Sequence, residues 1–182
     1  MRHVRLLSLG TALISLAAGL VYNIAITRKL PSAGLGLLTL LNASTAFSLL
    51  PNAVLSFALP RIAARDSGLD LKAALGVSSL FFAGSAALTA GYLALTWDKM
   101  GPDAPLVLAA ALATELVSYI SGAASSVLLV KDRGRFVFSN LAQAAAKIAA
   151  IPVIEAFKWS VAAVLWSSVA VTAVPAAYSL SR

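Results

Sequence analysis

Hydrophobic residues fill six long stretches of this chain, and polar residues gather in the short breaks between them. A bilayer core about 30 Å thick is crossed by roughly 20 apolar residues of α-helix. The pattern therefore predicts membrane-spanning helices over residues 6–26, 35–59, 73–95, 105–130, 136–157 and 159–180. The expected fold is an all-α membrane protein, a single domain over residues 1–182 with six transmembrane helices in one bundle.

The composition fits a lipid environment and excludes several kinds of catalytic and metal-binding site. Hydrophobic residues make up 60% of the chain, charged residues 12%, and the mean hydropathy is +0.89, which lies outside the range of soluble domains. Cysteine is absent, so disulfides and thiolate metal sites are excluded, and His3 is the one histidine. We expect no enzyme, no metal site and no cofactor, because the paired carboxylates, histidine clusters and Ser/His arrangements of catalytic sites do not occur.

The first stretch begins with basic residues, as a secretory signal peptide does. Its apolar run continues to Ile26, which is longer than the roughly 7 to 15 residues of a signal-peptide core. We therefore expect a retained first helix. Farther along, residues 60–76 connect the second and third spans, and their mixture of charged and apolar residues fits either a short amphipathic surface helix or a mixed-charge loop.

The net charge of +7 raises the question of nucleic acid, but the basic residues form no face interleaved with aromatics, so we expect no nucleic-acid partner. One side of the six spans carries nine basic residues: Arg2, Arg5, Arg61, Arg65, Lys72, Lys131, Arg133, Arg135 and Arg182. The other side carries four: Arg28, Lys29, Lys99 and Lys158. The positive-inside rule then predicts that both termini are cytoplasmic, in a multi-pass protein of the plasma membrane.

Polar side chains recur inside the predicted spans. The small ones, serine, threonine and glycine, favour helix packing, since close backbone approach drives helix association in lipid. The larger ones that can bind a polar ligand are Asn42, Asn52, Glu115, Asn140, Gln143 and Lys147. The last three are spaced by three and four residues, so they share one face of the fifth span. In the second span, Pro51 predicts a kink.

Glu115 and Lys147 lie sixteen residues on either side of Lys131, in an expected hairpin of the fourth and fifth spans. Both should therefore reach the same depth near mid-membrane, where a charge costs at least about 2.5 to 3.5 kcal/mol. Two interpretations are open. The two side chains form an ion pair that fixes the hairpin register, or both face a hydrated cavity. In such a cavity Lys147 would hold an anionic group, Glu115 would exchange a proton or tune the charge, and the amides would supply neutral hydrogen bonds.

Two segments resemble a known family. Residues 26–64, ITRKLPSAGLGLLTLLNASTAFSLLPNAVLSFALPRIAA, look like the first loop and second helix of polysaccharide and lipid-linked oligosaccharide flippases. These belong to the multidrug/oligosaccharidyl-lipid/polysaccharide exporter superfamily. The turn at residues 30–36 lacks the first glycine and the aromatic residue of the family pattern L-G-P-x-x-[FY]-G. The segment LVLAAALATELVSYISGAASSVLLVKDRGRFVFSNLAQAAAKIAA is similar to the fourth and fifth helices, and Gly134-Arg135-Phe136 matches the basic linker.

The resemblance implies flipping of a polyprenyl-phosphate-linked sugar across the membrane by alternating access, with Lys147 facing the pyrophosphate and Na⁺ or H⁺ coupling at Glu115. Family members have about twelve to fourteen helices in two halves related by internal duplication. This chain resembles the amino-terminal half. The other half would be a second copy or a separate chain, in addition to membrane lipid, or would be absent because the sequence is a fragment or a degenerate remnant. The alternative is a non-catalytic accessory subunit, for which Glu115 and Lys147 would form an ion pair. A channel or a drug exporter has less support, because there is one deep lysine and the deep charges balance.

Overall fold

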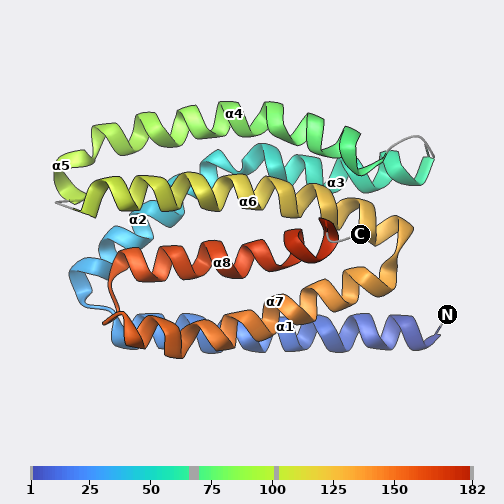
Figure 1. The fold of residues 1–182 in the computed structure, drawn as a ribbon, viewed down its shortest axis with the longest axis horizontal. Coiled ribbons are helices and arrows are strands. Elements are labelled where there is room, and N and C mark those ends of the chain that lie inside the picture. Colours follow the sequence, from blue (N-terminus) through green and yellow to red (C-terminus); the bar gives the residue numbers. More distant parts are fainter. Residues whose placement is uncertain (1, 66–69, 101–102, 181–182) are drawn as a thin grey trace.

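The computed structural model describes residues 2–65, 70–100 and 103–180, and every element within these ranges is a helix. The elements are α1 (Arg2–Lys29), α2 (Ser32–Ser48), α3 (Leu50–Arg65), α4 (Leu71–Leu95), α5 (Trp97–Met100), α6 (Ala104–Lys131), α7 (Arg133–Ala156) and α8 (Val161–Leu180). The long helices lie side by side and run the length of the molecule (Figure 1).

Five of the described helices are long and apolar enough to cross a membrane, namely α1, α4, α6, α7 and α8. Helices α2 and α3 pass the same test together and form a sixth candidate span when they are counted as one bent span. The predicted all-helical, multi-span membrane fold is confirmed on this basis. The predicted and observed boundaries differ by a few residues, except that α3 continues to Arg65.

The bent span breaks between Ser48 and Leu50, where the helix axis bends by 45°. Pro51 is the second residue of α3. Because proline has no backbone N–H, it cannot donate the helical hydrogen bond to the carbonyl of Phe47, four residues earlier. The kink predicted from Pro51 is confirmed.

Neighbours in the sequence are not always neighbours in the bundle. Helix α6 packs against α4, α3 and α8, whereas α7 packs mainly against α1 and α8. Figure 1 shows α8 lying between α6 and the α1–α7 pair, with α7 running obliquely from the end of α6 toward α1. The expected α6–α7 hairpin is therefore joined at its turn but splayed along its length.

The bundle has two distinct ends. Helix α1 begins and α8 ends toward the same end (Figure 1), which we call the terminal end, and the α1–α2 turn and α5 mark the opposite, far end. Helices α3 and α6 end at the terminal end, and α4 and α7 begin there (Figure 1). Arg61, Arg65, Lys72 and Arg133 occupy these helix ends. Helix α4 begins there after Asp70, whose carboxylate accepts from the Ala73 N–H at 2.8 Å. Residues 66–69, in the middle of the segment for which an amphipathic helix or a loop was expected, lie outside the described residues.

The buried core is larger toward the far end than toward the terminal end. The far-end core takes residues from seven of the described helices, every one except α3, including Tyr22 of α1, Leu41 of α2 and Ile154 of α7. A second core toward the terminal end joins residues of α3, α4 and α6 alone, among them Leu55 and Ala123. Since α1, α7 and α8 contribute nothing to this second core, the helices are held together most tightly at the far end.

Candidate functional site

Glu115 lies at the centre of a buried polar cluster. It projects from α6 toward α4, is 0% exposed, and accepts a hydrogen bond at Oε1 from the hydroxyl of Thr89. Thr89 Oγ1 in turn lies 2.7 Å from Ser48 Oγ. Ser48 Oγ also lies 3.1 Å from the backbone carbonyl of Ser44, so its one proton has two acceptors within reach, Ser44 O and Thr89 Oγ1. The second carboxyl oxygen, Oε2, has no partner in the described part of the chain.

A second hydrogen-bonded chain ends at the same helix break. Ser85 donates to the backbone carbonyl of Ser48, the last residue of α2, and lies 2.7 Å from the hydroxyl of Tyr119. Since the Ser85 proton is used, Tyr119 donates to Ser85. The five residues of this polar cluster are Ser48, Ser85, Thr89, Glu115 and Tyr119, and none is more than 4% exposed. The bend between α2 and α3 thus supplies both a hydroxyl and a carbonyl to one dry network of α2, α4 and α6.

Lys147 lies in a different part of the bundle. It is half-buried on α7, and its ammonium faces α1 at Gly19, where an added Cβ atom would lie 3.8 Å from Nζ. At 1.5 Å per residue, Lys147 is about 21 Å from the start of α7 and about 14 Å from its end, which places it near mid-membrane. Within the ranges that the structure describes, it has no hydrogen bond and no ion pair.

The structure does not bring Glu115 and Lys147 together. The salt bridges among the described residues join Lys29 to Glu155 at 3.4 Å and Arg135 to Asp132 at 3.4 Å, and neither involves the deep pair. Equal distance from a hairpin turn gives equal depth, but it does not give a shared face. Because α8 separates α6 from α7, Glu115 faces α4 and Lys147 faces α1. The ion-pair interpretation is corrected accordingly.

The four candidate amides do not gather at one place. Asn140 and Gln143 are half-buried and share the face of α7 that carries Lys147. Asn52 of α3 instead donates from Nδ2 to the backbone carbonyl of Ser118 at 3.2 Å, and Asn42 is exposed on α2. The six residues predicted to share one cavity are therefore dispersed: three lie on one face of α7, Glu115 lies in the buried polar cluster, and Asn52 and Asn42 lie apart from both.

Sequence reasoning missed Ser48 and Thr89 as partners of Glu115. A signal was present, because Ser85 and Thr89 are four residues apart, so both lie on one face of α4. These positions were interpreted as helix-packing surface, and they do pack. Their hydroxyl groups also solve the hydrogen-bonding problem of a buried carboxyl group, which required knowing that α4 is the helix opposite Glu115.

Comparison with known proteins gives no match: no family model, no curated protein and no solved structure matches the chain. In the described part of the chain, no three His, Cys, Asp or Glu side chains gather in an arrangement that could hold a metal ion. By helix length and hydropathy, the chain is a multi-span membrane protein.

Proposed function

We propose that this protein transports an anionic, lipid-linked sugar across the membrane, flipping an oligosaccharide or polysaccharide precursor between leaflets of the plasma membrane by alternating access. It acts as one six-span half, completed by a second copy or by a separate chain. One observation carries the proposal: an ammonium group lies near mid-membrane without a counter-ion among the described residues. The flippase resemblance of the sequence supplies the substrate class.

A buried lysine needs an anion or water. A charge at the bilayer centre costs at least about 2.5 to 3.5 kcal/mol, and such groups face a partner or a water-filled cavity. The carboxyl group at comparable depth, Glu115, is turned away and bonded to Thr89. A diphosphate group of the substrate would satisfy Lys147 with charge-assisted hydrogen bonds, and Asn140 and Gln143 on the same helix face would bind sugar hydroxyls.

The uneven core supports movement between two states. Seven helices share the core at the far end, whereas the core toward the terminal end is restricted to α3, α4 and α6. This arrangement fits a half that is closed on one side. We assign ion coupling to Glu115, because its unpartnered Oε2 lies in the cluster beside the bent α2–α3 span. Discontinuous helices of this kind form the ion sites of many transporters.

The test is a flipping assay in proteoliposomes. A polyprenyl-pyrophosphate sugar carrying a fluorescent group is placed in both leaflets, and an impermeant reductant destroys the outer fluorophores. Wild-type protein should move labelled lipid from the inner to the outer leaflet, so that the reductant also destroys the fluorescence of the inner pool. Lys147→Ala should slow quenching roughly tenfold or more, the loss expected for a hydrogen bond to a charged group. Lys147→Arg should keep part of the activity. Lys72→Ala removes an exposed lysine at the start of α4 and serves as the matched control.

Light scattering in mild detergent, corrected for bound detergent, would show whether the active species contains two copies. If the wild-type protein quenches no inner lipid, whether it is a homodimer or a monomer, the proposal of a homodimeric transporter is contradicted. If quenching were also absent when a co-purifying second membrane chain is present, the chain would be an accessory subunit instead. Equal activity of Lys147→Ala and wild type would remove Lys147 from the mechanism.

A further inference from the structure

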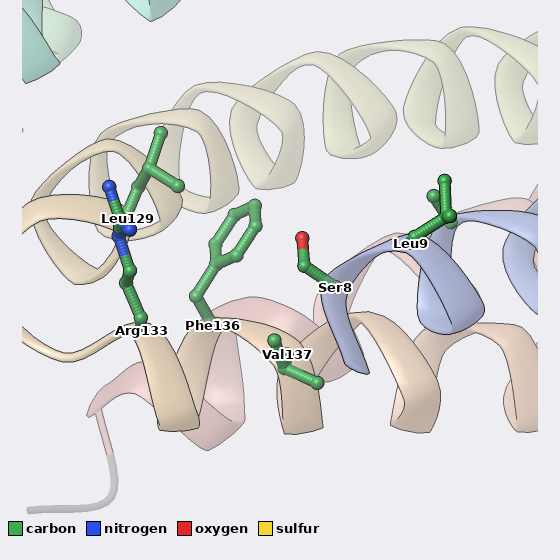
Figure 2. Close-up of a pocket in the computed structure, with 7 residues that line it drawn as sticks. Ser8, Leu9, Leu129, Arg133, Phe136 and Val137 are labelled. Atoms are coloured by element: carbon green, nitrogen blue, oxygen red, sulfur yellow. The ribbon is translucent and has the colours of Figure 1, made fainter. Parts of the chain in front are cut away.

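A groove opens at the terminal end between α1, α6 and α7, far from the Glu115 cluster. Its volume is about 460 Å³, within the range of roughly 300–1,000 Å³ that is typical of small-molecule sites. Helix α1 contributes Ser8, Leu9 and Ala12 to the wall, and α6 contributes Leu129. Figure 2 shows the groove with Ser8 and Leu9 on one side and Leu129 on the other.

Helix α7 forms the rest of the wall and gives the groove its polarity. Arg133, Phe136 and Val137 line it, and Figure 2 shows the guanidinium of Arg133 beside Leu129 and the ring of Phe136 between Arg133 and Ser8. Arg133 is the first residue of α7, at the end of the span where lipid phosphates lie. Val137 is one turn farther along the helix, about 6 Å deeper. The groove therefore runs from a cation at its mouth into an apolar interior.

The splaying of the helices explains why this space exists. Helix α7 leaves the end of α6 obliquely and reaches α1 lower in the bundle (Figure 1), so the three helices diverge where the groove lies. The core toward the terminal end takes no residue from α1 or α7. An apolar gap between spans does not stay empty in a bilayer, because lipid is the surrounding solvent.

The positive charge at the mouth is not neutralised locally. Asp132 is the nearest carboxylate in sequence, but it accepts from the backbone N–H of Arg135 at 3.0 Å and pairs with the Arg135 side chain at 3.4 Å. Among the described residues, Arg133 has no ion pair and is exposed. An anion at the level of the phosphates would complement it.

We propose that this groove binds an anionic phospholipid, with one acyl chain between α1 and α7 and the phosphate group against Arg133. Basic pockets between membrane-spanning helices bind anionic head groups in this way. The apolar wall selects a lipid chain, and Arg133, the one cation among the described lining residues, selects a negative head group over a zwitterionic one. The site is separate from Lys147 and does not depend on the proposed transport substrate.

Native mass spectrometry of the purified full chain would test the site. Protein in mild detergent is mixed with phosphatidylglycerol or with phosphatidylcholine of the same acyl chains, and the lipid-bound fraction is measured. Wild-type protein should retain phosphatidylglycerol preferentially. Arg133→Gln should weaken this retention roughly fivefold, the contribution of one cation near a membrane surface. Arg61→Gln, which removes an exposed cation of α3 at the same end, should retain the lipid like wild type.

A second variant tests the apolar part of the groove without changing charge. Ala12→Phe places a ring in the space of the acyl chain and should lower retention of both lipids. Circular dichroism and size exclusion confirm that each variant folds, and Lys147→Ala should retain lipid normally, which separates this site from the transport proposal. Equal losses from Arg133→Gln and Arg61→Gln would overturn the site in favour of diffuse attraction. Equal competition by glycerol phosphate, which has no acyl chain, would also overturn it.

Discussion

Two ionisable groups lie deep in this bundle, and their surroundings differ. Glu115 is fully buried among the hydroxyl groups of α2, α4 and α6, and one of its oxygens accepts from Thr89. Lys147 is half-buried between α7 and α1, with Gly19 opposite and without a hydrogen-bond partner in the described ranges. In the first environment, the carboxyl group is buried and hydrogen-bonded to its neighbours. The second leaves the lysine side chain partly exposed.

The difference indicates different roles. A buried polar group that is hydrogen-bonded into a network stabilises one arrangement of the helices that hold it. An ammonium group that the protein itself does not pair remains available to a ligand, because an unpaired charge in the membrane is costly and an anion would relieve that cost. We therefore expect substitutions around Glu115 to lower stability, in addition to their effect on the proposed ion coupling, and those at Lys147 to affect mainly binding.

The largest effect is expected from Glu115→Ala. This change removes the acceptor of the Thr89 hydroxyl and leaves a cavity between α4 and α6. Together these should lower the free energy of unfolding in detergent by about 3 kcal/mol. Chemical denaturation followed by helix content would measure it. Glu115→Gln keeps an oxygen for Thr89 and nearly the same volume, so it should retain most of the stability. Equal losses in both variants would contradict the cluster described here.

The next largest loss of stability is expected at one of two glycines that face polar side chains. A Cβ atom at Gly122 of α6 would lie 2.7 Å from Asn52 Oδ1, so Gly122→Ala must displace the amide that donates to Ser118. Loss of that bond should cost about 1 kcal/mol. A Cβ atom at Gly19 would lie 3.8 Å from the Lys147 ammonium, an ordinary contact. Thermal unfolding of the two variants should therefore show a clear loss for Gly122→Ala alone, and the reverse order would refute the comparison.

A smaller effect is expected on the Lys147 side of the bundle. The hydroxyl of Tyr22 in α1 lies 2.8 Å from Ser167 Oγ and 3.2 Å from Ser168 Oγ of α8. Both serines also donate to the carbonyl of Val164, so they keep a partner when the phenol is removed. Tyr22→Phe should lower the unfolding free energy by about 0.6 kcal/mol, the average for such bonds in membranes. Thermal denaturation in detergent would measure it, and a loss as large as that of Glu115→Ala would show a second rigid network.

The smallest effect on stability is expected from Lys147→Met. Methionine keeps the length of the side chain and removes an ammonium that no described residue pairs, so the unfolding free energy should stay within about 0.5 kcal/mol of wild type or rise. Denaturation in the absence of substrate would show this. A loss of several kcal/mol would mean that the charge has a structural partner in the protein.

Hydrophobic patterning predicted the fold well because span length is a one-dimensional property. The six stretches and the kink at Pro51 follow from counting residues and from the missing proline N–H. The partner of Glu115 did not follow, because depth along a helix says nothing about which helix lies opposite. The insertion of α8 between α6 and α7 depends on the packing of all spans together. Local spacing did identify Asn140, Gln143 and Lys147 as one face of α7.

The most direct test of the account is the water accessibility of position 147. The chain contains no cysteine, so single-cysteine variants carry one unambiguous label site. In proteoliposomes, Lys147→Cys should react with a water-soluble, membrane-impermeant thiol reagent, and a polyprenyl-pyrophosphate sugar should protect it. Ala145→Cys, exposed at nearly the same depth on about the opposite face of α7, should not react. An unreactive Lys147→Cys, or equal labelling at the two positions, would contradict an anion-binding cavity at Lys147.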